Sequence, residues 1–506
     1  MTTFLTADPS ILTDYRPYHG SMLIGGEFRD SVSGKRVDRV GPAHGIVAGN
    51  YADGSAEDAL LAISAARRAF DAGTWTSFTA KERAELLLKI ADGIAQRSEE
   101  MAIIECLETG KPLAQARGEV SGCVDLWRYA ASLARTLHGE SYNTLGDQML
   151  GLVLRQPVGV VSMITPWNFP IWILSQKLPF ALAAGCTVVI KPSEFTSGTT
   201  LMLGEILTDA GVPAGVVNIV TGLGTNVGSP LVDHDDVDMV SFTGSTRVGR
   251  HIAAEAGRKL KKVSLELGGK NPQIIFPDCD FDAAVDAVVF GVYFNAGECC
   301  NSGSRVLVHQ DIAEKFTRAV VEKASQVKVG DPLHPEVKVG SIINDNQMAV
   351  IEDAIRSARE QGAEILLGGD RVTTGQGLFM APTVVGGVKA EMQIAQEEVF
   401  GPVLAILTFA DYEEAISIAN NSLYGLSAAV WSKDIDICLE AARKINAGTI
   451  WVNTFLDGSP ELPFGGFKQS GLGRELGKGA VEDYTEQKTV QLHTGARTNW
   501  WINNAS

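Results

Sequence analysis

Two adjacent cysteines, Cys299 and Cys300, lie in residues 294–305 (FNAGECCNSGSR), a small, polar segment with flanking glycines. A thiol in such a segment is accessible to substrate, and a thiolate is a strong nucleophile. A nucleophilic cysteine usually recruits histidine, but the eight histidines are scattered and none lies in a motif-like segment. The pattern therefore favours covalent catalysis by Cys299 or Cys300 and disfavours a cysteine–histidine hydrolase.

A carboxylate and an amide are the next candidates. Glu266 ends the apolar run VSLEL before two glycines, where desolvation could raise its pKa toward that of a useful base. The alternative is a strand-end glutamate paired with Lys270. Asn168 lies in the segment PWNFP, where a rigid amide could donate to an oxyanion, and the alternative is an Asx turn.

A third candidate is a phosphate-binding turn at residues 244–249 (GSTRVG). This segment follows the strand-like run MVSF and precedes the helix-like run HIAAEAGRKL, so its backbone N–H groups could bind a phosphate. It lacks the GxGxxG spacing, and glycine-bearing strand-to-helix turns without ligands are common. Residues 222–228 (GLGTNVG) miss that spacing by one residue and predict a loop that enters a helix.

The elements that must position these residues alternate between strand and helix. Residues 56–72 and 81–94 place apolar side chains three and four apart, as amphipathic helices do. After Val158, β-branched runs alternate with helix-like stretches: VVSMI, TVVIK, VNIV, MVSF, VSLEL and QIIF, then SRVLVH, EILLGG, VLAILTF, LSAAVW and GTIWVN. The pattern predicts an α/β fold with a mainly parallel, doubly wound sheet and a second α/β domain, separated near Gly268–Gly269, with the site between them.

Composition excludes several classes of protein. The chain has 506 residues, a net charge of −17 and no Lys/Arg block, which argues against a nucleic-acid or anionic-membrane partner. Seven cysteines without CxxC or Cys/His spacing predict a reducing cytoplasm, no disulfide framework and no metal site. The N-terminus does not resemble a signal peptide. Residues 157–176 are uncharged but contain three prolines and an asparagine, so they predict a buried strand and loop.

Seven motifs occur in the order found in aldehyde dehydrogenases: PWNFP, KPSE, FTGSTxxG, ELGGK, GxxCxxxxR, EEVFGPV and PFGGFKQSGLGRE. The chain resembles this family, including members that act on betaine aldehyde, over nearly its whole length. The resemblance implies a Rossmann-type cofactor domain (1–134 and 158–267), an α/β catalytic domain (268–468) and a small β oligomerisation element (135–157 and 469–506). A homodimer or homotetramer is expected.

The resemblance also assigns the catalytic roles. Cys300, five residues before Arg305, matches the nucleophile, and Cys299 is its bystander. Glu266 matches the glutamate that activates water. Asn168 and the Cys300 backbone N–H match the two oxyanion donors. Lys177 and Glu475 match positions that orient Glu266 or relay its proton.

The cofactor residues follow in the same way. Lys191 and Glu194 match residues that bind the adenosine ribose, Ser245 contacts the pyrophosphate, and Glu398 with Phe400 positions the nicotinamide ribose. The same pocket includes Trp167, Thr243 and Gly244. A carboxylate such as Glu194 beside the ribose 2′-hydroxyl would repel a 2′-phosphate, so NAD is expected, with NADP as the alternative.

The resemblance identifies the substrate only by class. Residues at or near the aldehyde tunnel of relatives are aromatic: Phe169, Trp172, Phe294 and Phe464. They could bind an aliphatic or aromatic aldehyde, or a quaternary ammonium through cation–π attraction. Gln176 replaces a frequent tryptophan, which weakens an aromatic box. Glu298 replaces a common glutamine and predicts an extra carboxylate near the tunnel mouth, which would favour a cationic or amino-aldehyde.

The implied function is oxidation of an aldehyde to a carboxylic acid with NAD, through a Cys300 thiohemiacetal and a thioester that is hydrolysed by water activated by Glu266. One alternative is a coenzyme-A-acylating dehydrogenase, and Glu266 favours the acid. A second is a non-catalytic structural protein of the same fold, against which Cys300, Glu266 and Asn168 together argue. A third is a cofactor-independent thiol esterase.

Overall fold

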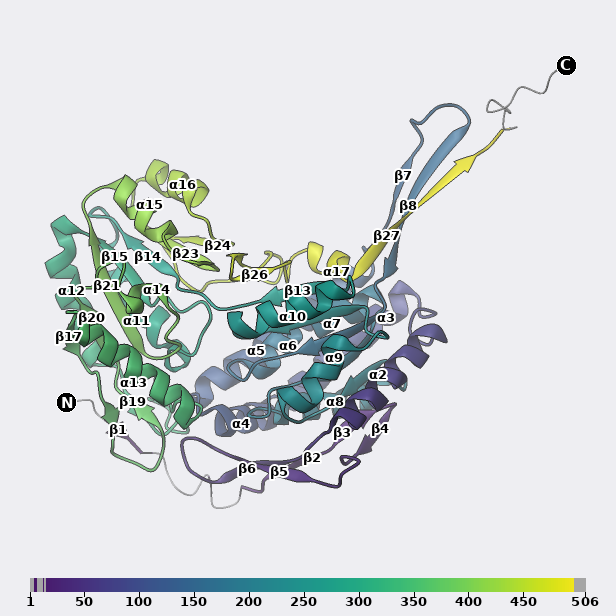
Figure 1. Cartoon of the computed structure of the whole chain (residues 1–506), viewed down its shortest axis with the longest axis horizontal. Helices are drawn as coiled ribbons and strands as arrows, with labels where there is room; N and C mark the ends of the chain where they lie inside the picture. The colour runs from purple at the N-terminus through teal and green to yellow at the C-terminus, as the bar shows by residue number, and fades with distance from the viewer. Residues whose placement is uncertain (1–3, 7–11, 13–14, 496–506) are drawn as a thin grey trace.

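The computed structural model describes residues 4–6, 12 and 15–495. Two α/β bodies lie side by side, and a narrow arm of strands projects away from them (Figure 1). Each body is built on one large sheet with helices packed against it. The predicted α/β class with two mainly parallel sheets is confirmed.

The first sheet has five parallel strands at its centre and antiparallel strands at both edges. Its spatial order is β26 (Gly471–Leu472), β13 (Lys262–Glu266), β12 (Met239–Thr243), β9 (Val160–Ile164), β10 (Thr187–Lys191), β11 (Val217–Ile219), β3 (Met22–Ile24) and β4 (Glu27–Arg29). The central strands are buried on both faces, which explains their unbroken β-branched runs.

The second sheet begins where the chain leaves β13. Its order is β17 (Glu364–Leu367), β20 (Thr383–Gly386), β21 (Val403–Phe409), β15 (Arg305–His309), β14 (Pro272–Ile275), β23 (Ser427–Trp431) and β24 (Thr449–Val452), and only β17 pairs antiparallel. The crossing between the two sheets, residues 267–271, contains the boundary predicted at Gly268–Gly269. The finer division into domains stays a prediction.

Helices cover both sheets (Figure 1). Those of the first body are α2 (Ala56–Asp71), α3 (Ala80–Gln96), α4 (Ser98–Thr109), α5 (Leu113–Ala134), α6 (Pro170–Ser175), α7 (Leu178–Ala184), α8 (Gly198–Ala210), α9 (Ser229–Asp233), α10 (Thr246–Arg258) and α17 (Gly479–Asp483). Those of the second are α11 (Phe281–Tyr293), α12 (Gln310–Ser325), α13 (Asp345–Glu360), α14 (Gln393–Gln396), α15 (Tyr412–Asn420) and α16 (Ile435–Lys444). The helices predicted at 56–72 and 81–94 are confirmed as α2 and α3, each with a capping box at its N-terminus.

Short strands complete the chain. They are β1 (Phe4–Leu5), β2 (Tyr18–Gly20), β5 (Arg36–Val40), β6 (Val47–Ala52), β16 (Val329–Gly330), β18 (Arg371–Val372), β19 (Phe379–Met380), β22 (Tyr424–Gly425) and β25 (Phe467–Lys468). Residues 222–228, predicted as a loop that enters a helix, contain a short π-helical turn at Gly224–Gly228 that continues into α9.

The arm consists of β7 (Glu140–Tyr142), β8 (Met149–Pro157) and β27 (Thr485–His493). β8 and β27 pair antiparallel over nine residues, from Met149 opposite His493 to Pro157 opposite Thr485. The element predicted as β structure at 135–157 and 469–506 thus contains a hairpin and a C-terminal strand, and its residues 496–506 lie outside the described part of the chain. Large apolar side chains on the arm are exposed, including Tyr142, Leu154 and Leu492.

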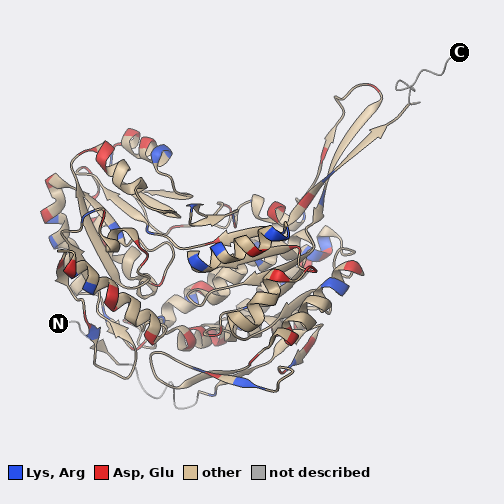
Figure 2. Ribbon diagram, in the orientation of Figure 1, with Lys and Arg blue, Asp and Glu red and all other residues tan. Residues whose placement is uncertain are grey.

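Charged residues of both signs are interspersed along the outer helices, while the central strands carry few of them (Figure 2). Among the described residues, no helix has the length and apolar character needed to cross a bilayer. The stretch 157–176 contains the buried strand β9, as predicted, but the part expected as a loop includes the short helix α6.

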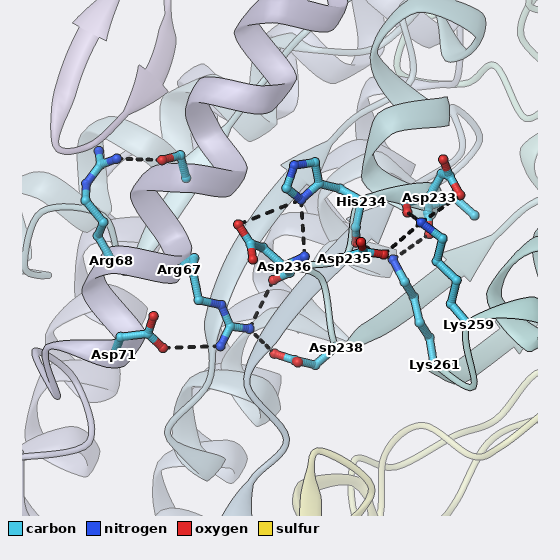
Figure 3. A network of polar contacts seen from close by, with 12 residues as sticks. Arg67, Arg68, Asp71, Asp233, His234, Asp235, Asp236, Asp238, Lys259 and Lys261 are labelled. Atoms are coloured by element: carbon cyan, nitrogen blue, oxygen red, sulfur yellow. Dashed lines mark hydrogen bonds and ion pairs between the residues drawn. The ribbon is translucent and has the colours of Figure 1, made fainter.

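A surface network of charged residues joins α2 to residues 233–238 (Figure 3). The Asp238 carboxylate accepts the Val160 backbone N–H at 2.7 Å and pairs with Arg67 from α2. Arg67 also donates to the Asp236 carbonyl at 3.0 Å. Nearby, Lys259 contacts Asp235 at 2.8 Å. Asp238 thus joins α2 to the strand that leads into the PWNFP segment.

Asp238→Ala is expected to lower the free energy of unfolding by about 1–3 kcal/mol, because the buried Val160 N–H loses its side-chain acceptor and Arg67 loses a partner. Urea unfolding monitored by circular dichroism measures the change. The matched control is Asp235→Ala, whose carboxylate is exposed and whose loss should change the midpoint much less. Equal effects of the two variants would contradict this role of Asp238.

Candidate active site

Four neighbouring strands of the first sheet end at the same edge and carry most of the predicted site. β9 leads to Asn168, β10 ends at Lys191, β12 ends at Thr243 and β13 ends at Glu266. The carboxyl ends of parallel strands form the usual ligand crevice of open α/β sheets. The sheet therefore brings together predicted residues that are about 100 positions apart in the sequence.

The cysteine segment faces this edge from the second sheet, in the loop between α11 and β15. Asn295, Ala296 and Gly297 have consecutive positive φ angles of 51°, 55° and 73°. At Gly297 a Cβ would lie 2.0 Å from the Gly401 carbonyl oxygen, so only glycine fits. Such an unusual backbone persists only where its surroundings determine it.

Asn168 joins the edge of the first sheet to this loop. Its side-chain Nδ2 donates to the Glu298 carbonyl at 3.1 Å. In return, Asn295 Nδ2 donates to the Asn168 carbonyl at 3.1 Å and to the Glu298 carbonyl at 2.9 Å. An amide NH₂ has two hydrogens, so Asn168 retains a second donor for an oxyanion. These contacts bring Asn168 and the cysteine segment together, as predicted.

A second asparagine fixes the nucleophile itself. Asn271 Nδ2 donates to the carbonyls of Cys300 at 2.8 Å and Ser302 at 3.0 Å. Sequence reasoning singled out neither Asn271 nor Asn295. The available signal was their position, because Asn271 directly follows ELGGK and Asn295 lies within the cysteine segment at 294–305.

The two adjacent thiols differ in access. All seven cysteines are free, and Cys300 alone is not fully buried. A hydrogen bond with Cys299, followed by burial, raises the pKa of Cys300. The same hydrogen bond lowers the pKa of Cys299. Cys299, however, packs against Phe169 and Ile173, so access favours Cys300 as the nucleophile, with a base needed to ionise it.

Glu266 is buried, and neither of its carboxylate oxygens has a hydrogen-bond partner within the described chain. Burial, and then the nearby Glu475 carboxyl group, raises the pKa of Glu266 well above its ordinary value. The alternative pairing with Lys270 is not present in the described structure, where the Lys270 amine also has no partner. Glu266 thus has the environment of a general base.

Lys177 and Glu475 are paired with each other. The Lys177 amine contacts the Glu475 carboxylate and donates to Ser241 Oγ at 3.2 Å, and both charged side chains are buried. Both also act electrostatically on Glu266. The structure therefore brings Lys177, Glu475 and Glu266 together, and it leaves Glu266 as the member without a partner.

The turn after β12 forms a cradle for an anion. Ser245 caps the N-terminus of α10, and the hydroxyls of Thr243 and Thr246 are buried without a partner in the described structure. At Gly249 a Cβ would lie 2.4 Å from Leu267, so glycine lets the helix approach the sheet. At the end of β10, two strands away from β12, the Lys191 amine lies 3.7 Å from the Glu194 carboxylate. Unused donors at a helix N-terminus suit a phosphate group.

Glu398 and Phe400 belong to the second body and lie between α14 and β21, whereas Trp167 follows β9 of the first body. Glu398 accepts the Gly269 N–H at 3.1 Å, and burial raises its pKa to about 7. At Gly268 a Cβ would lie 2.2 Å from Glu398 Oε2. Phe400, with a φ of 55°, packs edge-on against Trp167 at 5.4 Å between ring centroids. Trp167 thus contacts a segment of the second sheet beside the cysteine loop.

An aromatic wall lies beside Cys299. The rings of Phe169 and Phe294 stack at 6.0 Å with an interplanar angle of 21°, and Trp172 packs against the same cluster. At Gly122 of α5, a Cβ would lie 2.2 Å from Trp172, so α5 approaches this wall closely. Phe464 instead exchanges backbone hydrogen bonds with Glu475 and packs on the core of the first body.

The burial of Glu298 bears on the prediction of an extra carboxylate near the tunnel mouth. Its side chain is buried, and its Oε1 accepts the Ile343 backbone N–H at 3.1 Å. Burial raises the pKa of Glu298 well above its ordinary value, which favours the neutral form. The expected preference for cationic aldehydes loses this support.

Comparison with known proteins identifies relatives of the whole chain. The model of the aldehyde dehydrogenase family matches residues 28–490. The betaine aldehyde dehydrogenase of Bacillus subtilis (strain 168) is 43% identical over 453 residues, which are 89% of this chain and 92% of the relative. An NAD-dependent aldehyde dehydrogenase from Sinorhizobium meliloti has a TM-score of 0.97 and 48% identity over 99% of both chains. A point mutant of Staphylococcus aureus betaine aldehyde dehydrogenase, in complex with NAD+ and with a BME-modified cysteine, has a TM-score of 0.94 and 39% identity over 96% of this chain and 99% of its own.

Proposed function

The chain belongs to the aldehyde dehydrogenase family, and we propose that Cys300, Glu266 and Asn168 carry out its reaction, the NAD-dependent oxidation of an aldehyde to a carboxylic acid. The observation that carries this proposal is the hydrogen bond from Asn168 Nδ2 to the Glu298 carbonyl, which joins an oxyanion donor to the cysteine loop. The unpaired, buried Glu266 supplies the base.

The reaction begins when a base takes the Cys300 proton and the thiolate attacks the aldehyde carbon. Asn168 Nδ2 and the Cys300 backbone N–H donate to the resulting oxyanion. When bound, NAD supplies the acceptor for the hydride that leaves this carbon. Glu266 then takes a proton from water, whose oxygen attacks the thioester carbon, and the carbon–sulfur bond breaks. The carboxylic acid leaves and Cys300 is regenerated.

The residues of the first body fit NAD. The unpartnered Thr243 and Thr246 hydroxyls and the N-terminus of α10, capped by Ser245, offer donors for the pyrophosphate. Lys191 and the half-buried Glu194 offer a donor and an acceptor for ribose hydroxyls. The Glu194 carboxylate would repel a 2′-phosphate, which supports NAD over NADP. Glu398, with its raised pKa, would bind the second ribose.

The alternative functions are less well supported. A coenzyme-A-acylating dehydrogenase has no need of a buried base that activates water, and Glu266 is such a base. A non-catalytic role gives no reason for the three consecutive left-handed residues that support the cysteine loop.

We also propose a substrate class, an assembly and a compartment. The stacked rings of Phe169 and Phe294 suit an aldehyde whose tail is apolar or carries a quaternary ammonium. The exposed apolar side chains of the arm support a homo-oligomer, a dimer or a tetramer, assembled through β7, β8 and β27. Seven free cysteines support a reducing cytoplasm.

Reduction of NAD by the purified protein tests the proposal. The panel contains aliphatic, aromatic, ω-amino, trimethylammonio and acidic aldehydes, each with NAD or NADP and with or without coenzyme A. We expect NAD to give the higher kcat/KM, the product to be the free acid, and Cys300→Ala to abolish turnover. Cys438→Ala, which removes a buried thiol on α16, is the matched control and should retain activity. An active Cys300→Ala variant, or no reduction with any aldehyde, would overturn the proposal.

Glu266→Gln is expected to release about one equivalent of reduced nicotinamide per site and then to turn over about 10²–10⁴-fold more slowly, because the thioester forms but water is not activated. Glu266 acts as a base only when it is ionised, at pH values above its raised pKa. Wild-type kcat should therefore increase over a pH range well above the one in which an ordinary glutamate titrates. Rapid-mixing absorbance and a kcat–pH profile measure both effects. The control is the exposed Glu314→Gln. A variant that keeps the wild-type steady-state rate excludes Glu266 as the base.

A further inference from the structure

A buried lysine lies in the short connection between α4 and α5. The Lys111 side chain is 1% exposed, and its amine lies 3.3 Å from Glu105 Oε1 on α4. The same amine contacts the carboxylate of Glu119 on α5. Sequence reasoning did not single out any of these three residues. Their burial requires an explanation, because ions without partners are costly in a protein interior.

The third partner of this amine is the PWNFP segment. Lys111 Nζ donates to the main-chain carbonyl of Asn168 at 2.8 Å, and Asn295 Nδ2 donates to the same oxygen at 3.1 Å. The Lys111 ammonium also lies 4.5 Å from the ring centroid of Phe169. The carbonyl of Asn168 thus receives one charged and one neutral donor, while its side chain reaches the cysteine loop.

The charges of this cluster favour a permanently ionised lysine. Burial alone would lower the pKa of Lys111, but Glu119 and Glu105 outweigh it and raise that pKa. Burial and then Glu105 raise the pKa of Glu119 well above its ordinary value. Glu119 therefore favours its neutral form, while Lys111 stays charged.

We propose that Lys111 is a positioning residue for the oxyanion hole, which fixes the peptide group of Asn168 so that the side-chain amide stays directed at the reacting oxygen. Glu105 on α4 and Glu119 on α5 hold the amine in place. This inference rests on the proposed role of Asn168. Charge-assisted hydrogen bonds are about twice as strong as neutral ones, so the Lys111 contact is the firmer of the two on this carbonyl.

A double-mutant cycle between Lys111→Met and Asn168→Ala tests this proposal. Misplacement of a catalytic group by about 1 Å costs up to about 10²-fold in rate, so Lys111→Met should lower kcat by about 10- to 10²-fold with a smaller change in KM. In the Asn168→Ala background the same substitution should change kcat by less than about 2-fold, because the group it positions is gone.

Two further variants make the result decisive. The double variant Lys111→Met/Glu119→Leu removes both members of the ion pair. It replaces Lys111→Met if that variant does not fold, since apolar replacement of buried ion pairs is often tolerated. Lys270→Met removes another fully buried lysine, and any effect it has should be equal in both backgrounds. Circular dichroism checks the fold of each variant.

The outcomes separate the two claims. If Asn168→Ala lowers kcat but Lys111→Met lowers it equally in both backgrounds, or not at all, then Lys111 does not position Asn168 and only this inference fails. If Asn168→Ala itself retains the wild-type kcat, the proposed role of Asn168 fails and this inference fails with it. Loss of the Lys111 effect in the Asn168→Ala background supports the inference.

Discussion

The hydrogen bond from the Asn168 side-chain amide to the Glu298 carbonyl joins two halves of a site that no single element provides. Asn168 follows a strand of the first sheet, and Glu298 precedes a strand of the second. The return contact from Asn295 closes the link. Because oxyanion donors are most effective when they are fixed before the reaction, the oxyanion site depends on this junction between the sheets.

Around that junction, several buried charges have ionic partners. Lys177 is paired with Glu475, and Lys111 lies between two glutamates. Each pairing offsets the cost of removing ions from water. Glu266 has no such partner, so burial raises its pKa and favours the protonated form. The desolvation cost that ion pairing offsets elsewhere thus gives Glu266 the raised pKa of a general base.

The sequence predicted the strands well, because the central strands are buried on both faces and their β-branched runs are unbroken. The positions of Cys300, Glu266 and Asn168 were found from motifs that each lie at a strand end or loop. The burial of Glu298 was not predicted, because its partner Ile343 is distant in sequence and only tertiary packing brings the two together. Asn271 and Lys111 were missed, because their partners are distant in sequence and only tertiary packing brings them together.

The most direct test of this account is the single-turnover rate of NAD reduction by Asn168→Ala, measured together with the rate at which iodoacetamide alkylates Cys300. If Asn168 is the side-chain donor to the oxyanion, reduction slows by about 10²–10³-fold while alkylation of the thiol stays near the wild-type rate. Reduction at the wild-type rate would contradict the account, because the junction between the two sheets would then contribute nothing to the chemistry.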